Sequence, residues 1–148
     1  MRVKRELAWV EVYVEHLAAP QGSHRQGFGK SVRETNPRTE PYRHAVAEAC
    51  EDYTEEWSDM LSSEWVPLDG HLELDVVFKM LPPPKADPNR PYPNVAPDLD
   101  KLIRSTCDGI TRGRLWKDDA RLVRVSAAKV HAESPQDTGV LIRVRKLA

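Results

Sequence analysis

The chain has 148 residues, a hydrophobic fraction of 40%, four tryptophans and a formal net charge of −1. This length and composition fit one globular domain and exclude an intrinsically disordered chain. No apolar run is long enough for a membrane span, and the N-terminus lacks the apolar stretch of a signal peptide, so we expect a soluble, cytoplasmic protein that binds no membrane.

The charges are segregated along the chain. Residues 45–75 contain ten acidic residues and no Lys or Arg, whereas residues 79–148 contain fourteen basic and eight acidic residues. Such a distribution permits a basic face that binds nucleic acid and an acidic face that lies away from it. A solvated acidic helix on a protein with an otherwise ordinary surface is the alternative explanation, and charge alone does not decide between them.

The first half of the chain predicts a strand, a loop and a helix. Residues 7–14 are predicted to form the strand, because Val10, Val12 and Val14 alternate with other residues. Residues 18–40 are polar, basic and contain several glycines, so a long loop is predicted there. A helix is predicted to begin at Pro41, since apolar residues then recur at helical spacing as far as Leu61.

The second half predicts the remaining elements of an α+β domain. Residues 72–80 alternate as a half-buried strand, and the proline-rich residues 82–97 are predicted to form an extended loop. A second helix follows, with Gly109 and Gly113 as its stop, and residues 121–130 and 140–146 close the fold as strands. We therefore predict one domain over residues 1–148, in which a small mixed β-sheet packs with two main helices. The cysteines, Cys50 and Cys107, are predicted to be packed free thiols.

Acidic residues gather in two segments that the predicted elements separate. Asp98-Leu99-Asp100 stands at the start of the second helix, and Asp118-Asp119 follows about twenty residues later. Carboxylates drawn from separate elements suit a hard cation such as Mg²⁺, which can activate water against a phosphodiester. Alternatively, Asp98 and Asp100 cap the helix, and Asp118-Asp119 is only a polar turn.

One acid of the second pair is expected to join the site. Successive side chains of a strand face opposite sides, so Asp119 shares its face with Val123 and Val125, and Asp118 shares its face with Arg124. A carboxylate that continues an apolar face needs a partner such as a metal ion, because an unpaired buried charge is costly. This argument favours Asp119.

These motifs resemble a known signature. The run Pro97-Asp98-Leu99-Asp100-Lys101-Leu102, then Asp108-Gly109, then Leu115-Trp116-Lys117-Asp118-Asp119 is similar to that of the RusA family of Holliday-junction resolvases, which are frequent in phages and prophages. The resemblance implies a RusA-like fold and a homodimeric endonuclease that cuts four-way, branched DNA with Mg²⁺, for which Mn²⁺ is a substitute. It also implies that Asp98, Asp100 and Asp119 are the catalytic, metal-binding aspartates.

Basic residues near these acids are predicted to contact DNA. The resemblance implies a phosphate contact for Arg104, which stands where the best-known member has a lysine, although a helix-surface ion pair with Asp100 or Asp108 is the alternative. Lys101 and Lys117 lie beside the acids. The basic loop supplies the other two predicted contacts, Arg25 and Lys30.

The remaining motifs predict no organic cofactor. The spacing of Gly22 and Gly27 is that of a phosphate loop, but Phe28 stands where the lysine is needed, and the five histidines lack the spacing of zinc ligands. Two other functions stay open, namely a flap or fork nuclease with the same acidic site and a non-catalytic protein that binds DNA junctions. Whether Asp108 or Asp118 contributes to the site is open as well.

Overall fold

A four-stranded mixed sheet forms the centre of the protein. The computed structural model describes residues 8–22, 25–26, 32–33 and 36–147. The strands lie in the order β1 (Val10–Val14), β6 (Gly139–Lys146), β4 (Leu72–Met80) and β5 (Leu122–His131), with β4 and β5 parallel and the other neighbours antiparallel. β1 and β5 are therefore the two edges. The predicted α+β class is confirmed, as a single small domain.

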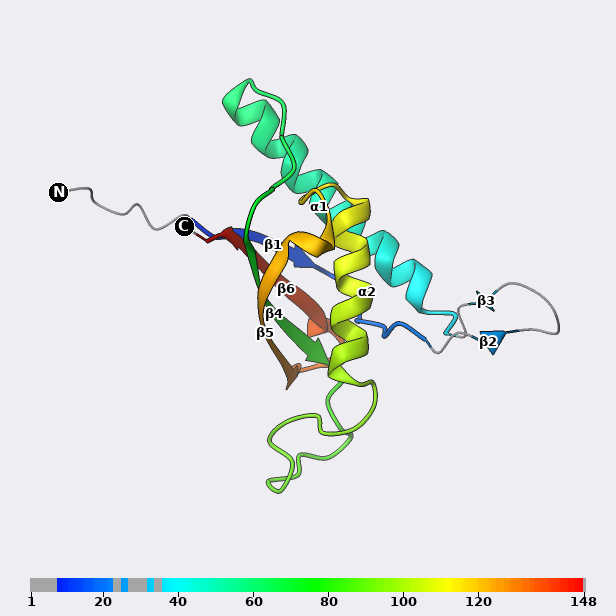
Figure 1. Cartoon of the computed structure of the whole chain (residues 1–148). Helices are drawn as coiled ribbons and strands as arrows, with labels where there is room; N and C mark the ends of the chain where they lie inside the picture. The colour runs from blue at the N-terminus through cyan, green and yellow to red at the C-terminus, as the bar shows by residue number, and fades with distance from the viewer. Residues whose placement is uncertain (1–7, 23–24, 27–31, 34–35, 148) are drawn as a thin grey trace.

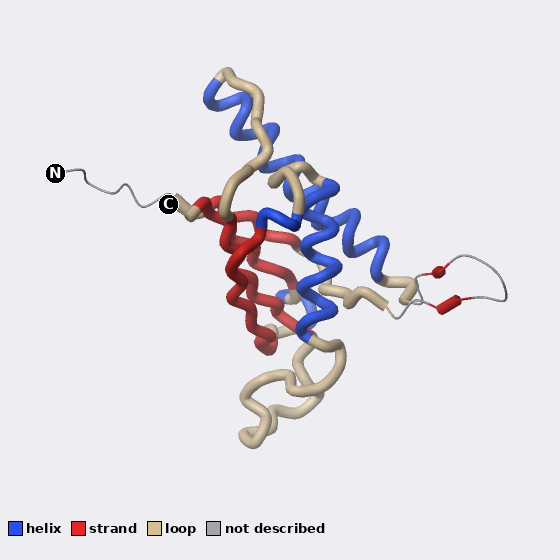
Figure 2. Tube along the Cα trace, in the orientation of Figure 1, coloured by secondary structure: helices blue, strands red, loops and turns tan. Residues whose placement is uncertain are grey.

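Two helices cover one face of this sheet. α1 (Thr39–Leu61) and α2 (Leu99–Arg112) lie next to each other over that face, as Figure 1 and Figure 2 show. The alternation in β4 explains this arrangement, because every second side chain from Leu72 to Met80 is buried toward the helices. These side chains form one core with apolar residues of the helices, among them Tyr42, Val46, Leu102 and Ile110.

The helices approach each other closely at the glycines of α2. A Cβ atom at Gly109 would lie 2.6 Å from the Cβ of Val46, and one at Gly113 would lie 2.7 Å from the carbonyl oxygen of Ala47. Gly109 is buried inside α2, which continues to Arg112. The prediction that Gly109 helps to end the helix is therefore wrong, and Gly113 alone takes the C-cap position.

The opposite face of the sheet carries ion pairs. The carboxylate of Glu73, whose side chain is 10% exposed, lies 3.2 Å from the guanidinium of Arg145 and 3.5 Å from that of Arg124. The guanidinium of Arg143 lies 3.1 Å from Asp75 on the neighbouring strand. Because each of these acids is paired, this face is charged but locally neutralised.

Several element boundaries agree with the prediction. The strand over residues 72–80 and the absence of helix and strand over residues 82–97 are confirmed. β1 begins at Val10, and residue 7 lies outside the described residues. α1 begins at Thr39, two residues before Pro41, which lies in the first turn, where its missing N–H costs little.

Two predictions in loops and turns are wrong. Residues 18–40 are not a continuous loop, because they contain a hairpin of two short strands, β2 (Arg25–Gln26) and β3 (Val32–Arg33), as well as the start of α1. The strand predicted from residue 121 begins at Leu122, because Arg121 belongs to a short 3₁₀ helix, η1 (Asp119–Arg121). A second 3₁₀ helix, η2 (Pro135–Asp137), precedes β6.

Both cysteines are free and buried, as predicted. Burial raises the pKa of the Cys50 thiol and of the Cys107 thiol to about 12, so both are packed as uncharged groups. In the part of the chain that the structure describes, no helix combines the length and the apolar character needed to cross a membrane.

Candidate active site

The first two candidate acids lie where the proline-rich loop enters α2. Asp98 takes the N-cap position with extended backbone (φ −69°, ψ 137°), and its carbonyl oxygen accepts the hydrogen bond of the Leu102 N–H at 3.1 Å. The Asp98 carboxylate makes no capping hydrogen bond and lies 3.8 Å from the Lys101 ammonium. Asp100 follows in the first turn and is exposed. The Asp98 carboxylate is therefore not consumed by capping the helix.

The second acidic pair lies in a tight turn after α2. The buried ring of Trp116 anchors this turn, and its Nε1 donates a hydrogen bond to the Thr111 hydroxyl at 2.7 Å. The Asp118 carboxylate accepts the Ala120 N–H at 2.8 Å and so starts η1, of which Asp119 is the first residue. The argument that favours Asp119 assumes that this residue lies in a strand. That assumption is wrong, because Asp119 lies in a 3₁₀ turn and precedes β5.

Like charges crowd around Asp119. A hydrogen bond with the Asp118 side chain, then partial burial, then the charges of Asp118 and Asp108 raise the pKa of Asp119. The N–H of Ala120, followed by the same contact with Asp119, lowers the pKa of Asp118. Ionisation of one carboxylate of this turn therefore disfavours ionisation of the other, and a bound cation would favour the charged form of both.

A groove of about 520 Å³ runs between α2 and β5. Acidic, basic and apolar side chains line it: Gln21, Ile103, Arg104, Cys107, Asp108, Asp119, Leu122, Val123, Arg124 and Val125. Arg104 forms no ion pair among the residues that the structure describes, because Asp108 pairs instead with Arg43 at 3.2 Å. The alternative in which Arg104 forms a helix-surface ion pair is therefore not supported, and its guanidinium is available to a phosphate.

Sequence reasoning missed two residues of this groove. The register of β5 against β4 shifts between Leu72 and Glu73, so that Leu72 pairs with Leu122 and Glu73 pairs with Arg124. Arg124 lines the groove, and the bulge at Val123 pairs it with Glu73, so simple alternation along β5 does not give its position. Gln21 reaches the site through a hydrogen bond from its N–H to the Lys101 carbonyl at 3.0 Å, for which the local sequence holds no signal.

The three predicted aspartates are not all brought together within one chain. Asp119 lies beside Asp108 and Cys107, whereas Asp100 lies eight residues earlier on α2 than Asp108, a rise of about 12 Å. Among the described residues, no group of three or more His, Cys, Asp or Glu side chains is placed to hold a metal ion. The assignment of Asp98, Asp100 and Asp119 as metal ligands stays a prediction.

The side chains available here are of the type that binds a hard cation. Mg²⁺ is usually held by one or two carboxylates, with waters and substrate phosphates completing its shell. Asp98 and Asp100 offer two exposed carboxylates, and Asp119 offers another beside Asp118 and Asp108. The donor chemistry therefore fits Mg²⁺, while the residues that the structure describes do not bring three such ligands together.

The predicted DNA contacts fall in different environments. Lys101 pairs with Asp98, and Lys117 lies 3.6 Å from Asp69 at the side of the acidic turn. Arg25 lies in β2, and Lys30 falls outside the described residues. Among Lys101, Arg104 and Lys117, only Arg104 lines the groove. The DNA-binding role of all five residues stays a prediction.

Comparison with known proteins identifies the family. The sequence model of the family described as "Endodeoxyribonuclease RusA" matches residues 18–145, which is nearly the whole chain. The match covers the groove, both acidic segments and strands β4 and β5. A search of the curated proteins gives no match. Given the extent of this match, the chain belongs to the RusA family of endodeoxyribonucleases.

Proposed function

We propose that this protein is a Mg²⁺-dependent, structure-specific endonuclease that resolves four-way DNA junctions in recombination and repair. The observation that carries the proposal is the groove between α2 and β5, in a chain of an endodeoxyribonuclease family. Its walls present carboxylates and guanidinium groups together. Phosphodiester hydrolysis needs both, because carboxylates suit a hard cation and guanidinium groups suit phosphate oxygens.

Two arginines are proposed to hold the DNA strand. The guanidinium of Arg104 is free of ion pairs among the described residues, and that of Arg124 is only loosely engaged, 3.5 Å from Glu73. A guanidinium fork matches two phosphate oxygens and keeps its charge at any physiological pH. Such contacts position the backbone without reading sequence, which suits a nuclease that recognises the shape of a junction.

The aspartates are proposed to act through the cation. Asp98, Asp100 and Asp119 would hold Mg²⁺, or Mn²⁺ in its place, and the bound ion would supply an activated water and stabilise the charge that develops on the phosphate. Asp118 positions Asp119, because its carboxylate accepts the Ala120 N–H that shapes the turn. The expected products carry a 5′-phosphate and a 3′-hydroxyl.

We infer a homodimer as the working unit, because a four-way junction has two-fold symmetry and is cut on two strands. β5 is an edge strand on which Val123 and Val125 are 58% and 43% exposed, and such an edge is a template for pairing. Antiparallel pairing of two β5 strands would place the Asp119 turn of one copy toward the far end of β5 in the other, where Lys129 holds the segment that leads into Asp98. A site built from both copies would then contain all three aspartates.

A cleavage assay on a synthetic four-way junction tests the proposal. With Mg²⁺, wild-type protein should cut the junction in paired strands, and Asp100→Asn should lower the rate by more than about a hundredfold, because loss of a ligand costs more than loss of one of its outer partners. Junction binding should persist, since the variant repels DNA less. Asp59→Asn, an exposed acid of α1, is the matched control and should cut normally.

The same assay separates the alternatives. Three-way and flap substrates measured beside the junction show whether another branched shape is preferred. Tight junction binding with no cleavage under Mg²⁺ or Mn²⁺ would instead mark a non-catalytic binding protein. Equal cleavage by wild type and Asp100→Asn contradicts the proposed mechanism.

A further inference from the structure

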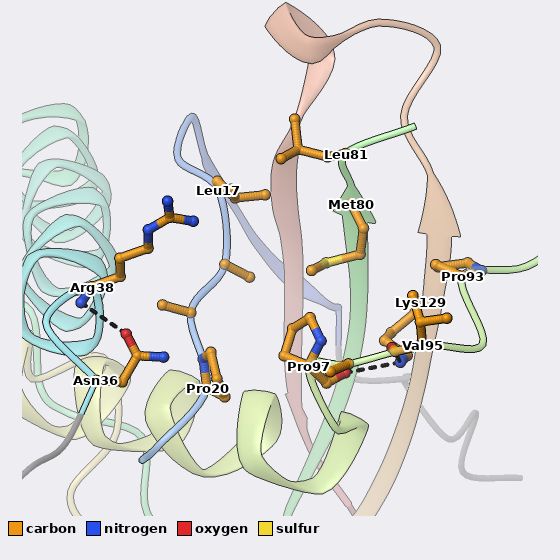
Figure 3. A pocket seen from close by; sticks show the side chains of 13 residues that line it. Leu17, Pro20, Asn36, Arg38, Met80, Leu81, Pro93, Val95, Pro97 and Lys129 are labelled. Carbon is orange, nitrogen blue, oxygen red and sulfur yellow. Dashed lines mark hydrogen bonds between the residues drawn. The ribbon is translucent and has the colours of Figure 1, made fainter. Parts of the chain in front are cut away.

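One lysine of β5 holds the end of the proline-rich loop. The Lys129 ammonium donates hydrogen bonds to the carbonyl oxygen of Val95 at 2.8 Å and to that of Pro97 at 2.9 Å. Figure 3 shows this side chain beside Val95 and Pro97, with its hydrogen bonding drawn as a dashed line. The next residue after Pro97 is Asp98, so the contact lies directly before a predicted catalytic carboxylate.

The register of the sheet explains how Lys129 reaches this loop. Lys129 pairs with Phe78 across the parallel strands, and Phe78 points into the core under the helices. Paired residues of neighbouring strands point to the same face, so Lys129 lies on the helix-covered side, near the start of α2. Two residues further along β5, the ring of His131 lies 3.2 Å from the carbonyl oxygen of Arg90. The end of β5 thus contacts the loop at two points.

These contacts restrict the backbone of Asp98 from one side. The Pro97 carbonyl and the Asp98 nitrogen belong to the same peptide plane, so a hydrogen bond to that oxygen limits rotation of the plane. From the other side, the Asp98 carbonyl oxygen accepts the first hydrogen bond of α2 from Leu102. With both of its peptide planes held, the backbone of Asp98 is fixed, and so is the direction of the Cα–Cβ bond from which its carboxylate extends.

We propose that Lys129 is a positioning residue that sets the direction of the Asp98 carboxylate for the reaction. The inference rests on the proposed nuclease function, since it assigns Lys129 to the same site. Its ammonium bonds to backbone carbonyls and is therefore placed to hold the loop. A metal ligand must be held to within about half an ångström to act efficiently, and a loop carrying one needs such support.

A different role would be a phosphate contact. Lys129 lies in the wall of a pocket of about 460 Å³, between residues 17–20 and the proline-rich loop, so its ammonium remains near solvent. A phosphate contact affects DNA affinity and its salt dependence, whereas a positioning residue affects turnover and cation requirement. The two roles therefore predict different measurements.

The experiment compares Lys129→Met with Lys129→Arg and with Lys79→Met as a matched control. Lys79 is also a strand lysine, and its ammonium lies 3.0 Å from Asp137, away from the groove. In Lys129→Met we expect kcat on the four-way junction to fall at least tenfold, the Mg²⁺ concentration for half-maximal rate to rise several-fold, and the junction Kd to stay within twofold. Lys129→Arg should recover most of the rate, because arginine keeps the donors. Lys79→Met should match wild type.

A second measurement does not depend on cleavage. Hydrogen exchange of the free protein should show faster exchange at the start of α2 in Lys129→Met than in wild type or Lys79→Met, above all at the amide of Leu102, which bonds to the Asp98 carbonyl. Unchanged exchange together with unchanged kcat overturns the inference, as does a weaker junction Kd with a normal kcat. Wild-type protein that cuts no branched DNA contradicts the proposed function instead, and the exchange data then still decide whether Lys129 holds Asp98.

Discussion

Arg104 is the residue whose surroundings match its predicted role most closely. It lies one helical turn from both Asp100 and Asp108, yet Asp108 pairs with Arg43, which leaves Arg104 facing the groove. An arginine that is held in an ion pair must lose that pair before it binds a phosphate, and Arg104, which forms no ion pair among the described residues, does not carry this cost. The groove therefore keeps one cation ready for the substrate.

We predict that Arg104→Gln weakens junction binding and reduces its salt dependence. Loss of one phosphate contact should lower the slope of log K against log salt by about 0.9, since fewer counterions are released. Titrations of labelled junction at several salt concentrations measure this slope. Lys146→Gln, which removes an exposed charge at the end of β6, is the control. An unchanged slope in Arg104→Gln would contradict a phosphate contact.

Gly109 supports a second prediction at the level of one residue. In a free helix, replacing glycine by alanine stabilises by about 1 kcal/mol, but here the new Cβ would lie 2.6 Å from that of Val46. We expect Gly109→Ala to destabilise the protein by about 1–3 kcal/mol, because the packed helices must separate. Urea unfolding measures the change. The penalty should shrink in a Val46→Ala background, and a stabilised Gly109→Ala would contradict the close contact.

At the level of elements, α1 and α2 are joined by a small charged cluster. Glu40, in the first turn of α1, lies 2.7 Å from Arg43 of the same helix and 3.1 Å from Arg112 of α2. Hydrogen bonds with Arg112 and then with Arg43 lower the pKa of Glu40 below its ordinary value of 4.5. A lowered pKa means that the ionised carboxylate stabilises the folded state.

This cluster predicts a pH dependence of stability. Its contribution is present above the ordinary pKa of Glu40 and is lost as the pH falls through the lowered one. Glu40→Gln should therefore lower Tm at pH 7. The loss in the free energy of unfolding should be no more than about 1 kcal/mol, because the group is exposed. Well below the ordinary pKa of 4.5, the two melting curves should converge. Glu48→Gln, which loses only a 3.8 Å contact with His44, is the control, and a constant Tm difference at all pH values would contradict the assignment.

Elements with strong local signals could be predicted from the sequence. The alternation over β4 and the prolines of residues 82–97 determine local backbone directly, and both were predicted correctly. Gly109 could not be interpreted, because its role depends on Val46 of another helix. The turn at Asp119 arises when the Asp118 side chain takes the Ala120 N–H, and the position of Arg124 depends on a bulge against β4. Such features depend on partners that a single segment does not reveal.

At the scale of the whole molecule, charge and shape divide the protein into two ends. The buried residues of α1 all lie between Thr39 and Cys50, and Figure 1 shows its later turns extending past the sheet. Those turns belong to the region of residues 45–75, which has no Lys or Arg. An acidic extension of this kind repels DNA, so bound DNA should lie on the side of the groove.

The proposed homodimer supports a prediction that only two chains can test. If each site takes Asp100 from one copy and Asp119 from the other, a mixed dimer of Asp100→Asn and Asp119→Asn contains one site with both changes and one intact site. Mixing the two inactive variants after unfolding and refolding should then restore single-strand nicking of the junction. Sedimentation should give twice the 16.8 kDa chain mass. No recovery in a verified mixed dimer would show that each site is built within one chain.

The two edges of the sheet differ in a way that would limit the proposed association to two copies. β1 has five residues and carries the exposed side chains of Glu11 and Tyr13, whereas β5 has ten residues. If β5 of one molecule joined the β1 edge of the next, each addition would leave one β1 edge and one β5 edge unpaired. The assembly would then grow as a filament. A β5 strand that joins its own copy uses the long edge of both molecules at once, so growth stops at two and only the short, charged edges remain outside.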